Sequence, residues 1–123
     1  MTLVVIESPL GSRRDGTRAP ESEVRRNKRY LTLCMRESLD RGEAPFASHR
    51  LYPGVLDDGD PAQRQLGMEA GFAWGGLCQL VAVYVDYGIT PGMQAGINCA
   101  RTRGARVVFR VLPCPGVDFE VAP

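Results

Sequence analysis

The side chains best suited to chemistry are acidic and polar residues that follow apolar runs. Glu7 and Ser8 come directly after the run 3–6, and Asp86 comes directly after the run 77–85. Both runs are continuous rather than alternating and rich in β-branched residues, which is typical of strands buried on both faces. Carboxylates at two adjacent strand ends could hold ribose hydroxyl groups, although Asp86 could simply cap its own turn.

A turn and a helix start follow Asp86. Gly88 lies in the turn, and Thr90-Pro91 predicts a helix with Thr90 as N-cap and Pro91 at the first helical position. The next backbone N–H groups have no partner inside the helix, and the helix dipole favours an anion or a hydroxyl oxygen there. We therefore expect binding at Gly92, Met93 and Gln94.

Two other segments offer candidates. Ser48 and His49 follow the predicted second strand, although a lone histidine is more often a structural, hydrogen-bonded residue. Glu69 lies in an otherwise apolar helical segment, where its carboxylate points either to solvent or into the pocket; burial would raise its pKa and suit it to acid–base work. The candidate catalytic residues are Asp86 and Glu69, and the candidate substrate-binding residues are Glu7, Ser8, Ser48, His49, Gly88, Gly92, Met93 and Gln94.

Several site classes lack their sequence signals. The four cysteines, Cys34, Cys78, Cys99 and Cys114, form no Cys-x-x-Cys pair, and the chain has one histidine. We expect buried free thiols and no structural metal. The motifs GxGxxG, GxxxxGK[ST], GxSxG and HExxH are absent, which disfavours Rossmann-type dinucleotide binding, P-loop hydrolysis and triad chemistry. No cofactor is expected.

Composition bounds the partners and the compartment. The 123 residues fit one domain, and the net charge of +1 makes nucleic acid an unlikely partner. No apolar run approaches the roughly 20 residues of a membrane span, and the N-terminus lacks the basic region of a signal peptide. We expect a cytoplasmic protein with no membrane contact. Basic residues cluster between positions 13 and 29 and could hold a phosphate, although a solvated surface is the simpler interpretation.

The elements that must position these residues alternate along the chain. Besides the two strands above, the sequence predicts strands at 44–48 and 106–112 and helices at about 22–41, 61–75 and 91–103. Ser22 and Asp60 are predicted N-caps, and Pro45 limits its strand to a first or edge position. In the middle helix we expect the sheet-facing side chains to be Leu66, Ala70, Ala73 and Trp74, and Gly67 and Gly71, four residues apart, permit close backbone approach. Phe72 or Trp74 could stack a base, but core packing is the simpler interpretation.

Alternation of strands and helices with short connections predicts parallel strands joined by right-handed crossovers. The predicted fold is α/β, a three-layer Rossmann-like sandwich with a small parallel sheet of four to five strands. The order 2-1-3-4 places the switch point between the first and third strands, so ligands should bind near Glu7 and residues 86–94. Residues 1–112 form the predicted domain. The tail 113–123, where Val117, Phe119 and Val121 alternate, could add an edge strand or a subunit contact.

Residues 86–100, Asp-Tyr-Gly-Ile-Thr-Pro-Gly-Met-Gln-Ala-Gly-Ile-Asn-Cys-Ala, resemble the signature of the nucleoside 2-deoxyribosyltransferase superfamily. In that superfamily an acidic residue follows the central strand, and a Gly-Met-Glu-like or Gly-Thr-x-x-Glu-like turn opens the next helix. The strand ending in Glu7-Ser8-Pro9-Leu10 is similar to the family's first strand. Residues 47–52, Asp57-Asp58 and residues 64–74 resemble a small phage-associated branch of uncharacterised proteins in it. The resemblance covers most of the chain, up to Leu112.

The resemblance implies a Rossmann-like domain that cleaves or transfers the N-glycosidic bond of nucleosides or nucleotides. A glutamate attacks the anomeric carbon, and an aspartate protonates or positions the base. A homo-oligomer is also implied, since a neighbouring subunit often completes such sites. Gln94 stands at the position matched to the nucleophilic glutamate, and a neutral amide cannot form a glycosyl ester. Glu69 is the acid nearest to the position matched to the family's aspartate.

Two main functions follow, and both remain open. The first is an enzyme in which Asp86 and Glu69 do acid–base work and Arg13, Arg14 or Arg18 folds over a phosphate. The second is a non-catalytic nucleotide-binding protein, a sensor or a sequestering protein, which Gln94 favours. A third and simpler option is a subunit whose surfaces only mediate assembly.

Overall fold

Four parallel strands form the centre of the protein in a computed structural model that describes residues 1–113. They are β1 (Thr2–Glu7), β2 (Glu43–Phe46), β3 (Leu80–Tyr84) and β4 (Arg106–Arg110). The order is β2-β1-β3-β4, which confirms the predicted order. From β1 the chain continues to β2 at one edge of the sheet, and from β3 it continues to β4 at the other edge. The switch point therefore lies between β1 and β3.

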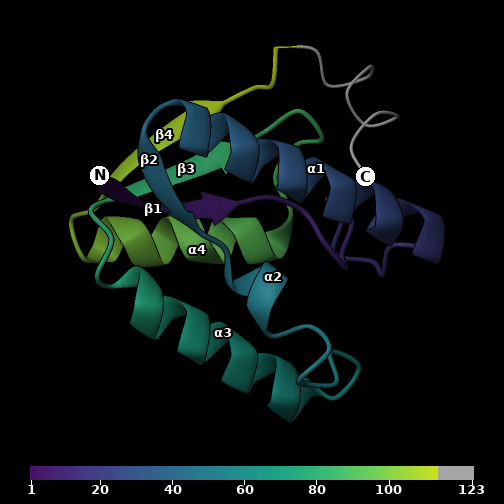
Figure 1. The fold of residues 1–123 in the computed structure, drawn as a ribbon. Coiled ribbons are helices and arrows are strands. Elements are labelled where there is room, and N and C mark those ends of the chain that lie inside the picture. The colour runs from purple at the N-terminus through teal and green to yellow at the C-terminus, as the bar shows by residue number, and fades with distance from the viewer. Residues whose placement is uncertain (114–123) are drawn as a thin grey trace.

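Helices cover both faces of the sheet, which confirms the predicted α/β sandwich (Figure 1). The helices are α1 (Glu21–Asp40), α2 (Ser48–Leu51), α3 (Pro61–Gly75) and α4 (Pro91–Thr102). Helix α1 lies on one face and α4 on the other, with α3 on the side of α4 and farther from the sheet. None of the helices in the described part of the chain has the length and apolar character needed to cross a bilayer.

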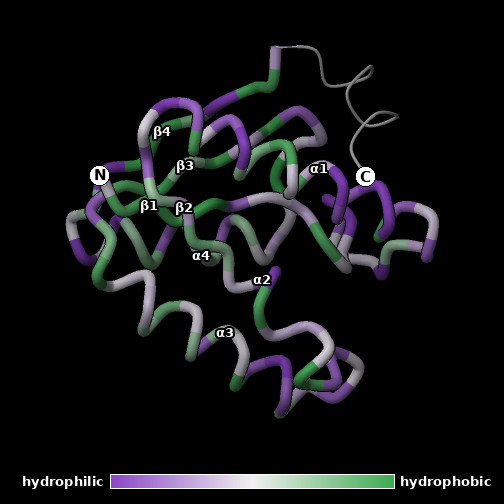
Figure 2. Tube along the Cα trace, in the orientation of Figure 1, coloured by the Kyte–Doolittle hydropathy of each residue, from purple (hydrophilic) through white to green (hydrophobic). Residues whose placement is uncertain are grey.

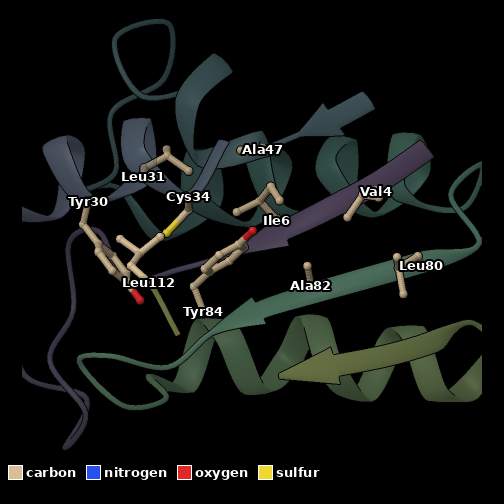
Figure 3. Packing of buried hydrophobic residues seen from close by; sticks show 10 residues of the cluster. All are labelled: Val4, Ile6, Tyr30, Leu31, Cys34, Ala47, Leu80, Ala82, Tyr84 and Leu112. Atoms are coloured by element: carbon tan, nitrogen blue, oxygen red, sulfur yellow. The ribbon is translucent and has the colours of Figure 1, made fainter. Parts of the chain in front are cut away.

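The core has two parts because the central strands are buried on both faces. One part joins β1 and β3 to Tyr30, Leu31 and Cys34 of α1, as the close view in Figure 3 shows. The other joins β3 to Met93, Ile97 and Ala100 of α4. The central strands are therefore largely hydrophobic in Figure 2, while α1 alternates between hydrophobic and hydrophilic residues as an amphipathic helix does.

Two of the three predicted helix starts are confirmed. The Asp60 side chain accepts a hydrogen bond from the Ala62 N–H, and the Thr90 side chain accepts one from the Met93 N–H. The prediction of Ser22 as a cap is wrong, because Pro20 takes the N-cap position and its extended backbone starts α1 two residues earlier than a cap at Ser22 would. The Pro20 carbonyl accepts the first bonds of the helix, so no capping side chain is required.

The predicted inward face of α3 is also wrong. Leu66 and Trp74 are 55% and 57% exposed, and Ala73 is exposed as well. The inward positions belong instead to glycines spaced four residues apart, Gly67, Gly71 and Gly75. A Cβ at position 71 would lie 2.6 Å from the Ser48 Cβ. The close approach of α3 to α2 and β1, and not the largest apolar side chains of α3, therefore decides which face of this helix points inward.

Other differences concern the ends of elements. The strands predicted at 77–85 and 106–112 are shorter in the structure, where β3 is Leu80–Tyr84 and β4 is Arg106–Arg110. The second strand was predicted to reach Ser48, but β2 ends at Phe46 because Ser48 starts the short helix α2, which the sequence analysis did not predict. The predicted edge strand or subunit contact of Val117, Phe119 and Val121 lies outside the described residues, as does Cys114. Cys34 and Cys78 are buried free thiols.

The close approach at Gly71 gives a first prediction. Gly71→Ala should lower the free energy of unfolding by about 1–3 kcal/mol, because the new methyl group overlaps Ser48 and the helix must shift. Urea denaturation followed by circular dichroism measures this change. Gly76→Ala is the control, since its Cβ would lie no closer than 3.4 Å to a neighbour and should not destabilise. Equal stability of the two variants would contradict the prediction.

Candidate functional site

A pocket of about 650 Å³ opens beside the carboxyl end of β1 and the N-terminus of α4. This is the switch point of the sheet, where ligands bind in α/β folds of this kind. The first turns of α1 and α4, the N-terminal half of α3 and the short helix α2 contribute to its walls. Six of the eight predicted binding residues line it: Glu7, Ser8, Ser48, His49, Gly92 and Met93.

Glu7 is the most buried carboxyl in the pocket. It is the last residue of β1 and pairs with Val83 of β3, so its backbone is fixed. Burial raises the pKa of its carboxyl to about 8. Within residues 1–113 no group donates a hydrogen bond to this carboxyl. It packs against the backbone of α4 at Gly96, where a Cβ would lie 2.5 Å from the Glu7 Cδ and closer still to Oε2.

Ser8 and His49 form a hydrogen-bonded pair beside Glu7. The Ser8 Oγ lies 2.7 Å from the His49 Nε2, and Ser8 is buried. Burial, together with the smaller effect of the positive charge of Arg50, lowers the pKa of His49 to about 4. A neutral imidazole can accept a hydrogen bond from the Ser8 hydroxyl. The pair therefore presents a polarised hydroxyl to a ligand without adding charge.

The rim of the pocket is cationic. Arg18 from the loop before α1, Lys28 of α1 and Arg64 of α3 line it, and none forms an ion pair with another described residue. Two exposed acids, Glu21 and Asp58, share the rim. The first turns of three helices add the positive ends of their dipoles, so the mouth favours an anionic group.

Of the three loop arginines predicted to cover a phosphate, only Arg18 lines the pocket. The loop folds back on itself, with the Ala19 N–H donating to the Gly11 carbonyl and the Arg13 N–H to that of Thr17. The Arg13 guanidinium pairs with Glu23 at 2.6 Å. The Arg14 side chain lies against Gly88, where a Cβ would be 2.6 Å from the Arg14 Nε. Gly88 itself is outside the pocket.

Asp86 lies outside the pocket, and its hydrogen bonds join separate elements of the fold. Its carboxylate accepts a hydrogen bond from the Tyr30 hydroxyl at 2.5 Å and from the Leu112 N–H at 3.1 Å. The Asp86 N–H donates in turn to the Tyr30 oxygen. These bonds join α1, the end of β3 and the chain after β4, so Asp86 has a structural role across elements and not the capping of its own turn that was the alternative to a ligand role.

Glu69 and Gln94 also lie away from the pocket. Glu69 is exposed on α3 and accepts a hydrogen bond from Gln65. Gln94 is exposed on α4, and its amide donates to the Asn98 side chain at 2.9 Å. Helical geometry explains this position, because Met93, Gly96 and Ile97 face the core and residue 94 is rotated away from them.

Some pocket residues were missed by sequence reasoning. Tyr52, Arg64 and Met68 carry no local motif and come together only through the tilt of α3. Gly96, which packs against Glu7 and is not among the residues lining the pocket, did carry a signal: counted from Gly92, the Gly-Thr-x-x-Glu spacing places its last residue at position 96 and not at Gln94.

A protein-family model described as Domain of unknown function (DUF7768) matches residues 2–110. The chain belongs to this family. No curated protein and no solved structure matches the chain. Every pocket residue named above lies within the DUF7768 match. In the part of this DUF7768 chain that the structure describes, no cluster of His, Cys, Asp and Glu side chains is arranged to hold a metal ion.

Glu7 and His49 together predict how stability depends on pH. Folded Glu7 keeps its proton up to about pH 8 rather than 4.5, so its contribution to stability falls as the pH rises through that interval. Folded His49 stays neutral down to about pH 4 rather than 6.5, so its contribution rises with pH over that interval. The two effects oppose each other below about pH 6.5, and above it stability falls until about pH 8. Thermal denaturation across this range checks the profile.

The control for this profile is a pair of glutamine variants. Glu7→Gln should remove the fall in melting temperature above pH 6.5, while Glu21→Gln, an exposed rim acid, should keep it. A wild-type melting temperature that stays constant from pH 6.5 to 8 would refute the pKa shift of Glu7.

The contacts of Asp86 give a separate prediction. Asp86→Asn should lower the free energy of unfolding by about 1–3 kcal/mol, because an amide nitrogen cannot accept the bonds that Tyr30 and Leu112 donate. Chemical denaturation measures the loss. Glu69→Gln is the matched control and should change stability by less than about 0.5 kcal/mol, since Glu69 is exposed. Wild-type stability in Asp86→Asn would show that these bonds contribute little.

Proposed function

We propose that this DUF7768 chain binds a nucleoside or nucleotide in the pocket at the end of β1 and cleaves or transfers its N-glycosidic bond. One observation carries the proposal: a single pocket combines an unpaired carboxyl, a neutral Ser–His pair and unpaired cations from three different elements. Its volume of about 650 Å³ lies in the range of small-molecule sites. The resemblance of residues 86–100 to the deoxyribosyltransferase superfamily supports the same ligand class.

Each end of such a ligand has a chemical counterpart in the pocket. The cationic rim of Arg18, Lys28 and Arg64 suits a phosphate, because guanidinium and ammonium groups bind phosphate oxygens strongly. Tyr52 and Phe72 offer aromatic surface to a base. The ribose would then lie between them, near the Ser8 hydroxyl and the Glu7 carboxyl.

Glycosidic cleavage needs a carboxyl close to the anomeric carbon. Asp86 is engaged with Tyr30 and Leu112, and Glu69 faces solvent, so neither is placed to serve this ligand. Among the described acids that line the pocket, Glu21 and Asp58 are exposed at the rim and Glu7 is the buried one. The proposal therefore assigns the catalytic role to Glu7 instead of to Asp86 and Glu69.

The second candidate is a protein that binds the nucleotide without turning it over, as a sensor or a sequestering protein. The observation in its favour is that the described part of the pocket holds one buried carboxyl, whereas glycosidases typically use two. A homo-oligomer, in which a neighbouring subunit adds to the site, stays a prediction, as does a cytoplasmic location.

Incubation of the purified protein with a mixed pool of nucleosides and nucleotides tests both candidates. Mass spectrometry should detect released base, and retention of an intact nucleotide without released base would favour the binding protein. Arg18→Ala with Arg64→Ala should weaken nucleotide binding roughly tenfold or more and leave nucleoside binding unchanged, since each charged contact contributes about 1.5–3 kcal/mol. Arg36→Ala, which removes an exposed cation paired with Asp40, is the control. Neither product nor retained ligand would reject both candidates.

A further inference from the structure

We infer that Glu7 is the nucleophile of the proposed glycosidic reaction, delivered from the end of β1 into a space that Gly96 leaves open on α4. The inference rests on the proposed function, since it names the reacting residue of that same site. It differs from the pattern implied by the resemblance, in which the helix itself carries the glutamate.

The first step concerns space. Gly96 is buried and faces β1, and the Glu7 carboxyl lies where a side chain at position 96 would begin. A Cβ there would be 2.5 Å from the Glu7 Cδ, a separation that real Cβ atoms do not show. The absence of a side chain at Gly96 is therefore a condition for the position of the Glu7 carboxyl.

The second step concerns availability. Elsewhere in the described chain the half-buried carboxylates are engaged: Glu43 with Arg110 and Ser38, and Asp86 with Tyr30 and Leu112. Glu7 has no such partner and lines the pocket. No buried side-chain N or O atom of the described residues lacks a hydrogen-bond partner, so the half-buried Glu7 oxygens, which have none, are open to the pocket and not sealed in the core. A carboxyl that no residue of the described range 1–113 hydrogen-bonds can approach a ligand without first breaking such a bond.

The third step concerns orientation. The backbone of Glu7 is held in the sheet by its pairing with Val83, and the next residue is fixed by the bond from Ser8 to His49. Such a rigid setting favours attack, because positioning the reacting atom in advance lowers the entropic barrier. Burial raises the pKa of Glu7 to about 8, which makes its ionised form more basic, and more nucleophilic, than that of an exposed carboxylate.

The fourth step concerns the sequence. The Gly-Thr-x-x-Glu spacing, counted from Gly92, ends at position 96, where this chain has glycine. A carboxyl from β1 thus reaches the region that a glutamate on α4 would occupy at its base. Glu7 on β1 would thus take the place of the glutamate that α4 lacks.

The reaction divides into two balanced steps. An ionised Glu7 oxygen forms a bond to the anomeric carbon as the bond from that carbon to the base nitrogen breaks; its electron pair stays on the nitrogen, which takes a proton from water. A second water then attacks the anomeric carbon, the ester bond to Glu7 breaks, and the carboxylate is restored. The surplus proton neutralises the hydroxide left by the first step. The net change is hydrolysis to free base and sugar, with retained configuration.

A mechanism-based probe tests the inference directly. The full chain is incubated with 2′-deoxy-2′-fluoro-arabino nucleosides and their 5′-monophosphates, since the fluorine slows the second step and lets the ester accumulate. Intact-protein mass spectrometry should show the added fluorosugar or its phosphate, and peptide mapping should place it on Glu7. Glu7→Gln should lose both the adduct and at least 100-fold of the rate of base release from the matching 2′-deoxy substrates. Asp40→Asn, which changes an exposed acid of α1 outside the pocket, should keep both.

The exchange of positions supplies a second test. Gly96→Ala should reduce base release at least tenfold, because its methyl group displaces the Glu7 carboxyl. Glu7→Gly combined with Gly96→Glu should recover part of the activity that Glu7→Gly loses, and its adduct should move to position 96. Circular dichroism confirms that each variant is folded.

Failure of the two ideas gives different results. If folded wild-type protein releases no base from any nucleoside or nucleotide, the proposed function is rejected and the nucleophile with it. If wild-type protein releases base but folded Glu7→Gln does so within tenfold of its rate, the function stands and Glu7 is not the nucleophile. An adduct mapped to any other residue would overturn the inference in the same way.

Discussion

A side chain at position 96 and the carboxyl of Glu7 cannot occupy the same space, and the arrangement of the pocket follows from that exclusion. Because residue 96 is glycine, α4 can lie close to the end of β1 while Met93, Ile97 and Ala100 still pack on β3. The N-terminus of α4 then points into the pocket beside Glu7 instead of being closed off by it. A larger residue at 96 would push the carboxyl into the pocket or the helix away from the sheet.

Glu43, another acid shielded from solvent, is paired with neighbouring side chains, whereas Glu7 is not. Glu43 lies on one edge strand and Arg110 on the other, and their two-point ion pair is almost wholly buried, with Ser38 also donating to Glu43. Burying a charge without a partner costs several kcal/mol, so such pairing is the expected solution. Glu7 follows another route, in which its raised pKa keeps it largely uncharged near neutral pH. That solution preserves a carboxyl that a ligand can still reach.

Sequence reasoning predicted the fold well because its signals were local. The continuous apolar run of β3 and the Thr90-Pro91 helix start depend on nearby residues alone, and both were correct. It wrongly assigned the sheet-facing side of α3 to Leu66 and Trp74, which are exposed. The close approach expected at Gly67 and Gly71 is confirmed, but its partners, such as Ser48, lie in other elements and could not be identified from this segment alone. The location of the site followed from topology, so six binding residues were brought together. The roles of Asp86 and Glu69 depended on long-range contacts, which no local pattern contains.

The pocket also has a gradient of charge that bears on its ligand. Its inner end holds a largely protonated Glu7 and a neutral His49 near neutral pH, while Arg18, Lys28 and Arg64 surround the mouth. A ligand with an uncharged body and one anionic end matches this gradient, because the anion stays near the helix dipoles and the cations. A ligand that is anionic throughout would gain nothing at the inner end, and at the mouth the three cations outnumber the two exposed acids, Glu21 and Asp58. The gradient therefore favours a nucleoside 5′-phosphate that enters base and sugar first, with its anomeric carbon brought to Glu7.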